Sequence, residues 1–401
     1  MPRVGAQERG ALRRLGCDDR AATSSAPAQR RLTRRIDAVG TGRQAIGAPR
    51  LARVEPDRTP IDAVAPLRIS FCGGGTDLPH WYEEHGGAVL SATIDHSVRV
   101  RLAPRDDREI RVRSLDLGHM VAYHLDRGPA YDGVMDLPKA AIARMGITRG
   151  VDLQIESDAP PGSGLGGSSA LVTAVVAALA MLTDRPLTAH EVARLSHRIE
   201  RENLGISGGW QDQYAAAFGG FNFLEFSRAE VSVSPVGASA ETLAALGRQL
   251  LLCYTGSVRR NVGLIDRQIQ LHREGREDTI LGMKRLQEMA FAMRHAVERG
   301  DIDVLGSLLD DAFVAKKQMN PYIAEHTPIE EMLSAARSAG AIGGKICGAG
   351  GGGYLLLAAP PSAHETIRTA LERSGGQFAS FAFSSDGVRA RRGRDVWAPS
   401  S

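Results

Sequence analysis

A glycine-rich segment between residues 158 and 170 restricts what this chain can fold into more than any other feature. It reads Asp158-Ala-Pro-Pro-Gly-Ser-Gly-Leu-Gly-Gly-Ser-Ser-Ala170. Residues 151–156 before it alternate apolar and polar side chains, as in a half-buried strand, and the apolar run that begins at Ala170 favours a helix. Glycines allow close approach to the backbone, and a helix N-terminus offers unpaired N–H groups. The segment therefore predicts a phosphate-binding loop between a strand and a helix.

Two well-known phosphate loops fit this segment poorly. Gly162, Gly164 and Gly167 satisfy the G-x-G-x-x-G pattern of dinucleotide-binding folds, but such a fold needs a second strand that ends in an acidic residue about 20 residues later. That place holds the continuing helix and a turn at 183–186. A Walker loop needs Lys where Ser168 stands. A tight turn without a ligand is the remaining alternative, at a high entropic cost for so many glycines.

Composition narrows the class of protein. The chain has 401 residues, of which 43% are hydrophobic and 24% charged, so it can form two or three globular domains. Four cysteines without a close pair exclude a disulfide framework and a Cys-x-x-Cys metal site, and they favour a reducing cytoplasm. The longest apolar run, 170–182, is too short to span a bilayer. We expect a cytoplasmic protein without a membrane partner.

Charge separates the first 60 residues from the rest. Thirteen Arg, no Lys and six acidic residues give residues 1–60 a charge of +7, which leaves −4 for the remainder, because the net charge is +3. The body therefore lacks the basic character of a nucleic-acid-binding protein, and we expect no such partner. Residues 1–60 have no hydrophobic period and no apolar core of a secretory signal. They are predicted to be a disordered basic extension.

The body predicts a mixture of strands and helices. Apolar runs of strand length lie at 65–71, 88–102 (interpreted as a pair of strands around Asp95-His96), 151–156, 354–358 and 377–383. Thr188 and Glu191 form a capping box at the start of a helix. Residues 284–317 predict one or two amphipathic helices broken near Gly300, and 363–373 predict another helix.

Three segments, in the same order, resemble one family. Pro160-Pro-Gly-Ser-Gly-Leu-Gly-Gly-Ser-Ser-Ala170 resembles the central ATP loop of the GHMP kinases, the family of galactokinase, homoserine kinase, mevalonate kinase and phosphomevalonate kinase. Pro66-Leu-Arg-Ile-Ser-Phe-Cys-Gly-Gly-Gly-Thr-Asp-Leu-Pro79 looks like its N-terminal substrate motif, and Gly343-Gly-Lys-Ile-Cys-Gly-Ala-Gly-Gly-Gly-Gly-Tyr354 like its C-terminal glycine motif.

The resemblance implies a two-domain α+β fold. It places an N-terminal ATP and substrate domain at 61–245 and a C-terminal domain at 246–401, after the extension at 1–60. It also implies that the C-terminal glycines pack against the ATP loop. ATP is then expected to bind at Pro161, Gly162, Ser163, Gly164, Leu165, Gly166, Gly167, Ser168 and Ser169.

Two carboxylates lie between the second and third motifs, in Glu200-Arg-Glu-Asn-Leu-Gly-Ile-Ser-Gly-Gly-Trp-Gln-Asp212-Gln. From the pattern alone, Glu200 reads as a solvent-facing helical residue and Asp212 as a carboxylate at a helix N-terminus. The resemblance implies instead that Glu200 binds Mg²⁺ together with Ser169. It implies that Asp212 is the catalytic residue that orients the acceptor hydroxyl or accepts its proton.

Further residues receive roles from the same resemblance. Arg68 is expected beside Asp212, where it stabilises the transferring charge, and Asp77 is expected to accept hydrogen bonds from sugar hydroxyls. A substrate that carries a phosphate also needs cations, for which Arg259, Arg260 and the Lys316-Lys317 pair are candidates. We leave the role of Lys345 open. The expected substrate-binding residues are Gly74, Gly75, Thr76, Asp77, Gly209, Arg259, Lys316, Lys317, Gly350 and Gly351.

Details of the motifs look like one branch of the family, the D-glycero-D-manno-heptose 7-phosphate kinases and the kinase domain of L-fucokinases. Cys72-Gly-Gly-Gly-Thr-Asp77 replaces the Gly-Glu-His-Thr-Asp-Tyr type of galactokinase. One departure is Asn261-Val-Gly-Leu264, where the branch has a Ser/Thr-rich stretch. We expect a kinase that uses Mg²⁺ and ATP to phosphorylate the anomeric hydroxyl of heptose 7-phosphate. A free-sugar 1-kinase of the fucokinase type, a catalytically silent sugar and ATP sensor, and a nucleotide-sugar oxidoreductase are the alternatives.

Overall fold

The computed structural model describes residues 57–258 and 263–393. The extension predicted for residues 1–60 lies outside this part of the chain, except for residues 57–60. Of these, Asp57 accepts a hydrogen bond from Arg392, near the other end of the described chain. Arg259 and Arg260, two of the candidate cations, also lie outside the described residues.

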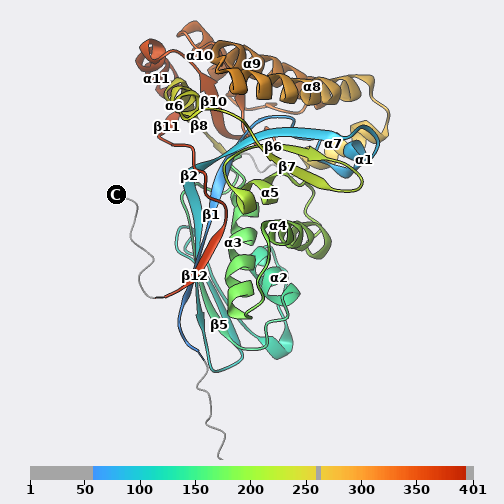
Figure 1. Ribbon diagram of the computed structural model, residues 1–401, viewed down its shortest axis with the longest axis vertical. Helices are drawn as coiled ribbons and strands as arrows, with labels where there is room; N and C mark the ends of the chain where they lie inside the picture. Colours follow the sequence, from blue (N-terminus) through green and yellow to red (C-terminus); the bar gives the residue numbers. More distant parts are fainter. Residues whose placement is uncertain (1–56, 259–262, 394–401) are drawn as a thin grey trace, which may run out of the picture. The chain divides into compact units, whose positions relative to one another are not determined.

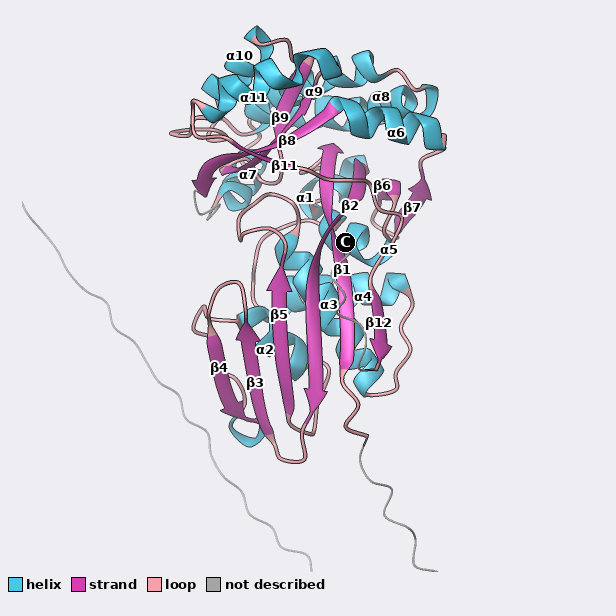
Figure 2. Ribbon diagram, turned by 90° about the vertical axis from the view of Figure 1, so that its left-hand side faces the viewer, coloured by secondary structure: helices cyan, strands magenta, loops and turns pink. Residues whose placement is uncertain are grey.

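The first sheet has eight strands, in the order β12-β1-β2-β5-β3-β4, and β6 and β7 extend it from β2 (Figure 2). Its neighbouring strands are antiparallel except for β3 and β5. This arrangement rules out the parallel sheet of a dinucleotide-binding fold. The strands are β1 (Ile61–Cys72), β2 (Gly87–Pro104), β3 (Glu109–Ser114), β4 (Met120–His124), β5 (Val151–Ser157), β6 (Phe221–Phe226), β7 (Val231–Pro235) and β12 (Arg389–Arg392).

Helices cover one face of this sheet, and α3 lies closest to its centre (Figure 1). Most of the buried residues of α3 are Ala or Val, so its backbone packs closely against β1 and β2. The sequence predicted a pair of strands around Asp95 and His96, and this prediction is wrong: both residues lie within the single strand β2. The helices here are α1 (Pro79–His85), α2 (Asp136–Arg144), α3 (Gly167–Leu182), α4 (Ala189–Arg198) and α5 (Gln211–Phe218), with a π-helical turn at Ile199–Asn203 and a 3₁₀ turn at Leu125–Arg127.

Residues 88–102 form one strand and not two because β2 changes its neighbouring strand along its length. Residues 87–92 pair with β6, whereas residues 98–104 pair with β5. Between them the register with β1 shifts, since Pro66 faces Ser97 but Arg68 faces Thr93. The polar Asp95-His96 pair therefore marks a β-bulge at which the strand moves from one neighbour to another.

The second sheet has four antiparallel strands in the order β11-β8-β10-β9, with helices packed against it (Figure 1). Its strands are β8 (Leu250–Val258), β9 (Gly343–Ile346), β10 (Gly352–Ala358) and β11 (Gln377–Ala379). The helices in this half are α6 (Ala240–Gln249), α7 (Leu264–Arg273), α8 (Glu277–Arg299), α9 (Ile302–Met319), α10 (Ile329–Ser338) and α11 (His364–Glu372), with a 3₁₀ turn at Pro361–Ala363.

Most element predictions are confirmed, and one strand is shorter than predicted. Gly300 ends α8 in a left-handed conformation and Asp301 caps α9, so the predicted helical break is present. The capping box of Thr188 and Glu191 is also formed. The strand predicted at 377–383 stops at Ala379, because the chain then leaves β8. Phe383 instead bridges Ile94 of the first sheet.

The two-domain architecture is thus present, while the boundary at 245/246 stays a prediction. The change from the first sheet to the second occurs between β7 and β8, and β12 returns the chain to the first sheet. Contacts of α8 and α9 with β1 join the two halves. Among the described residues, none of the helices combines the length and apolar character needed to cross a membrane.

Candidate active site

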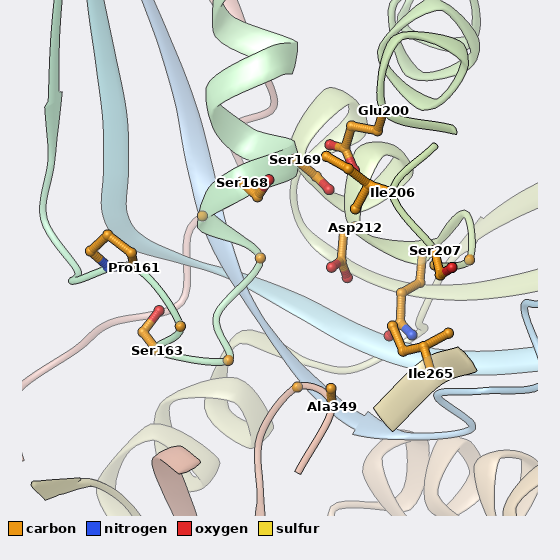
Figure 3. Close-up of a pocket in the computed structure, with 18 of the residues that line it drawn as sticks. Pro161, Ser163, Ser168, Ser169, Glu200, Ile206, Ser207, Asp212, Ile265 and Ala349 are labelled. Carbon is orange, nitrogen blue, oxygen red and sulfur yellow. The ribbon is translucent and has the colours of Figure 1, made fainter. Parts of the chain in front are cut away.

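A cavity of about 1060 Å³ lies where the two halves meet. Both faces of it come from motifs that the sequence singled out: the glycine loop, defined here as residues 160–169, and the turn at 73–75. Helices α7 and α9 and the start of the C-terminal glycine run also line it. Figure 3 shows Asp212 pointing into this space, with Pro161, Ser163 and Ser168 on one side and Ser207 and Ile265 on the other.

The glycine loop holds a backbone conformation that favours glycine. Gly162, Gly164 and Gly166 all have φ near +80°, and Gly166 is the N-cap of α3. A Cβ on Gly164 would lie 2.7 Å from the carbonyl oxygen of Cys347. The loop therefore presents free backbone N–H groups at the start of α3, which is the arrangement that binds phosphate.

The C-terminal glycine run packs against this loop, as the resemblance implied. The backbone N–H of Tyr354 donates to the carbonyl oxygen of Ser163 over 3.0 Å. A Cβ on Gly353 would lie 2.3 Å from the same oxygen. Gly348 and Ala349 reach the cavity wall, whereas Gly350 and Gly351 are not among its lining residues. The run thus positions the loop chiefly through backbone contacts.

Arg68 and Asp212 form an ion pair inside the cavity. The Arg68 Nε and Nη2 atoms lie 2.8 and 2.6 Å from the same oxygen, Oδ1 of Asp212. The Nη1 atom donates to the carbonyl oxygen of Gly164 over 2.7 Å, and only 4% of the Arg68 side chain is exposed. Asp212 is more open, at 27%. Arg68 therefore fixes the carboxylate against the glycine loop and leaves Oδ2 toward the cavity.

Asp77 supports the start of α5, the helix that carries Asp212. Its Oδ1 accepts hydrogen bonds from the backbone N–H of Gly75 and the side-chain amide of Gln211, and its Oδ2 accepts the backbone N–H of Gln211. A Cβ on Gly209 would lie 2.0 Å from Oδ2, so this position has no room for a side chain. Burial raises the pKa of Asp77, and these N–H donors oppose the shift. Asp77 lines the cavity while binding the helix that positions Asp212.

Glu200, Ser169 and Gln213 meet at a buried position beside Asp212. The Gln213 Nε2 atom lies 3.0 Å from both Ser169 Oγ and Glu200 Oε2. Glu200 is 2% exposed, and Arg201 lies 3.1 Å from its Oε2 atom. The solvent-facing alternative for Glu200 is therefore wrong, because the π-helical turn rotates this residue inward. Sequence reasoning did not identify Gln213, whose only signal was its place next to Asp212.

The Glu200 carboxylate has the properties of a metal ligand. Its Oε1 atom is buried without a hydrogen-bond partner in the described chain, and burial raises the pKa of this group. Such an orphaned oxygen is costly unless a cation or donor meets it. The oxygen atoms of Glu200 and Ser169 suit Mg²⁺, which binds few protein ligands and retains water. The described residues contain no group of three or more His, Cys, Asp or Glu that could hold a metal.

Two further lysines distinguish themselves by their burial. Lys316 is 7% and Lys345 is 4% exposed, and both line the cavity. Lys317 does not line it; this side chain forms an ion pair with Glu330. Thr76 and Leu165 also lie outside the lining, where the Thr76 hydroxyl donates to Gly73 and the Leu165 carbonyl accepts the N–H of Arg68.

One part of the cavity wall is apolar. It is formed by β2, β5, the connection between β3 and β4, the start of α3 and the segment around α2. Its lining side chains include Val98, Leu117, Met135, Leu137, Ile155 and Leu171. Leu117 and Tyr131 in this part are 44% and 49% exposed. Apolar surfaces of this kind accept flat ring systems.

Comparisons with known proteins agree on one family. The model described as GHMP kinases N terminal domain matches residues 134–220, and the model described as GHMP kinases C terminal matches residues 293–377. D-glycero-alpha-D-manno-heptose 7-phosphate kinase of Campylobacter jejuni is 34% identical over 83% of this chain and 99% of its own length. The bifunctional fucokinase/GDP-fucose pyrophosphorylase of Arabidopsis thaliana is 27% identical over 79% of this chain but only 31% of its own length.

A solved structure shares the architecture. The D-glycero-D-manno-heptose 1-phosphate kinase of Bacteroides thetaiotaomicron superposes with a TM-score of 0.69 and 28% identity, covering 84% of this chain and all of the other.

Proposed function

The chain belongs to the GHMP kinase family and is an ATP-dependent sugar kinase, and on that premise we propose that it phosphorylates the anomeric hydroxyl of D-glycero-D-manno-heptose 7-phosphate. The product would be heptose 1,7-bisphosphate. The observation that carries this proposal is the Arg68–Asp212 pair, which faces the cavity between the glycine loop and the turn at 73–75. A phosphate donor on the loop and an acceptor on the turn would meet at this pair.

Asp212 acts on the acceptor in this proposal. Arg68 holds its Oδ1 atom, so Oδ2 is directed at the acceptor hydroxyl and can orient it or accept its proton. The same guanidinium lies against the glycine loop, where it can stabilise charge on the phosphoryl group during transfer. The N–H groups at the start of α3 bind the phosphates of ATP, and the apolar part of the wall accepts the nucleobase.

Glu200 and Ser169 would hold Mg²⁺. The Oε1 atom of Glu200 and the hydroxyl of Ser169 would be the ligands, and Gln213 donates a hydrogen bond to each of these side chains. Bound Mg²⁺ neutralises charge on the ATP phosphates. Arg201 contributes indirectly: it contacts Glu200 and donates to the carbonyl oxygens of Ile206 and Gly209, so it connects the metal ligand to the loop before Asp212.

The phosphate that the acceptor already carries distinguishes this proposal from the alternative, a free-sugar 1-kinase of the fucokinase type. The 34% identity to a heptose 7-phosphate kinase over nearly all of that protein supports a phosphorylated acceptor. A kinase of the fucokinase type would act on a free sugar and needs no cation for a distal phosphate. Lys316 lies in the cavity wall and is available for such a phosphate, whereas Lys317 lies outside it. The cytoplasmic location expected from the sequence is part of the proposal.

Release of ADP across a panel of acceptors tests the function. The panel contains heptose 7-phosphate, mannose 6-phosphate, free heptose, L-fucose and galactose, each with Mg²⁺ and ATP, and Asp212→Asn is measured beside the wild type. We expect strong turnover of heptose 7-phosphate that the variant loses. Preference for a free sugar would move the substrate to the fucokinase-like alternative. Binding of ATP without turnover of any acceptor would favour the sensor alternative.

A further inference from the structure

Lys316 and Lys345 are two buried cations with no carboxylate partner in the described chain. The ammonium group of Lys316 donates to the carbonyl oxygen of Gly348, and that of Lys345 donates to the carbonyl oxygen of Ser70 over 2.7 Å. Each therefore has one neutral acceptor for three N–H donors. Burial of an ammonium group without a counter-charge is unfavourable. Burial, together with the nearby Lys345, lowers the pKa of Lys316 to about 7.

The groups around this pair supply no negative charge. Cys72 and Cys347 lie close to both lysines, but burial raises the pKa of both thiols, so they are neutral at physiological pH. The third nearby cation, Arg68, is already paired with Asp212. The pair thus leaves an excess of positive charge at the wall of the cavity.

The position of the pair indicates which ligand it meets. Met319, one helical turn from Lys316 on α9, packs at the turn that carries Gly75, where Gln268 also contacts the chain. On its other side, Lys316 bonds to Gly348, which packs against Gly164 of the glycine loop. The lysines therefore lie between the expected positions of acceptor and nucleotide. We name this wall, formed by Gly74, Gly75, Gln268, Lys316, Met319 and Lys345, the α9 side.

We propose that Lys316 and Lys345 together bind a phosphate group on the α9 side of the cavity. This inference rests on the proposed function for the identity of the acceptor, but it extends that function by a second cation, Lys345, and by a defined anion site. A phosphate group supplies both the negative charge and the several acceptor oxygens that the two ammonium groups lack. Two phosphates have access to this wall: the one that the acceptor carries and the one in transfer from ATP.

Steady-state kinetics of Lys316→Met and Lys345→Met distinguish the two sources. Met has a similar length and removes the charge. If the site binds the acceptor's phosphate, KM for heptose 7-phosphate rises at least about tenfold, while free heptose is unaffected. If the site binds the phosphoryl group in transfer from ATP, kcat falls at least about tenfold with both acceptors, and the KM values for both acceptors stay unchanged. Unchanged kcat and KM in both variants would overturn the proposal.

Lys317→Met is the matched control, because Lys317 is the neighbouring residue and lies outside the cavity. We expect it to behave as the wild type in every assay. Thermal unfolding tests for a structural role: replacing an unpaired buried ammonium by Met should leave Tm unchanged or raise it. A large fall in Tm that accompanies the loss of activity would assign the lysines to the fold and overturn the proposal.

Binding of inorganic phosphate makes the test independent of the acceptor. Calorimetry on the intact protein saturated with ADP measures this binding, since ADP occupies the glycine loop. The wild type and Lys317→Met should bind phosphate alike, and the two buried-lysine variants at least about tenfold more weakly. If the acceptor panel shows no turnover but this difference is found, the anion site stands and the proposed substrate fails. Equal binding by all four proteins would contradict the anion site.

Discussion

The glycine loop and the α9 side line the same cavity but are built in different ways. The loop comes from one continuous segment and presents backbone N–H groups, held by glycines whose φ is near +80°. The α9 side presents side chains from α7, α9 and β9, which are distant in sequence. A backbone site recognises what all phosphate donors share, whereas side chains from several elements can be changed one at a time. Under the proposed function, the glycine loop binds the phosphate donor and the α9 side selects the acceptor.

The largest expected effect lies between the two walls, at Asp212. Asp212→Asn keeps the size of the side chain but removes the charge that orients or deprotonates the acceptor, so kcat should fall about 10²- to 10⁴-fold. The affinity for ATP, measured by fluorescence titration, should stay the same, because the glycine loop is untouched. A variant with near wild-type kcat would show that Asp212 has no part in the chemical step.

The metal ligands come next. Glu200→Gln removes the charge from a carboxylate whose buried Oε1 atom has no hydrogen-bond partner among the described residues, so the Mg²⁺ concentration for half-maximal activity should rise about 10- to 100-fold. Glu202→Gln is the matched control, since Glu202 lies in the same π-helical turn but is exposed and paired with Arg144. Equal Mg²⁺ dependence in the two variants would remove Glu200 from the proposed metal site.

The backbone character of the loop is tested by Gly164→Ala. The new Cβ would lie 2.7 Å from the carbonyl oxygen of Cys347, on a residue with φ near +80°, so KM for ATP should rise about tenfold from strain of about 1–3 kcal/mol. Gly275→Ala is the control, because Gly275 has a similar positive φ but open space around its Cβ position. A similar KM in both variants would mean that the contact with the C-terminal glycine run does not shape the nucleotide site.

The smallest expected effect is the pH dependence of stability from the α9 side. The pKa of Lys316 is about 7 in the folded protein and about 10.5 unfolded, so between these values the unfolded chain binds more protons. The free energy of unfolding should therefore gain up to about 1 kcal/mol per pH unit above pH 7, relative to Lys316→Met. Urea unfolding at pH 7, 8 and 9 measures this difference. If the free energies of unfolding of the wild type and Lys316→Met changed with pH in the same way, burial would not lower the pKa of Lys316.

The sequence predicted the loop side better than the side-chain wall. The glycines and the start of α5 at Asp212 are local patterns, and the structure contains both. The burial of Glu200 depends on a π-helical turn, which apolar periodicity does not reveal. Gln213 needed the same tertiary information.

The lysines show most clearly what the sequence could not predict about the cavity wall. Lys316 and Lys317 are adjacent and chemically identical, so the sequence could not distinguish them, yet the helix directs Lys316 into the cavity and Lys317 to Glu330 on α10. Lys345 belongs to a motif, but its proximity to Lys316 arises only when β9 packs beside α9. The predicted strand pair at 88–102 was wrong for a similar reason, since the change of partner along β2 is set by β5 and β6.

The central claim is that this cavity transfers a phosphoryl group to the anomeric oxygen of a sugar phosphate. Phosphorus NMR of the product made from heptose 7-phosphate, Mg²⁺ and ATP tests it most directly. The account predicts a second phosphate whose signal is coupled to the anomeric proton, and no such product with Asp212→Asn. A phosphate on any other hydroxyl, or release of inorganic phosphate without a phosphorylated sugar, would contradict it.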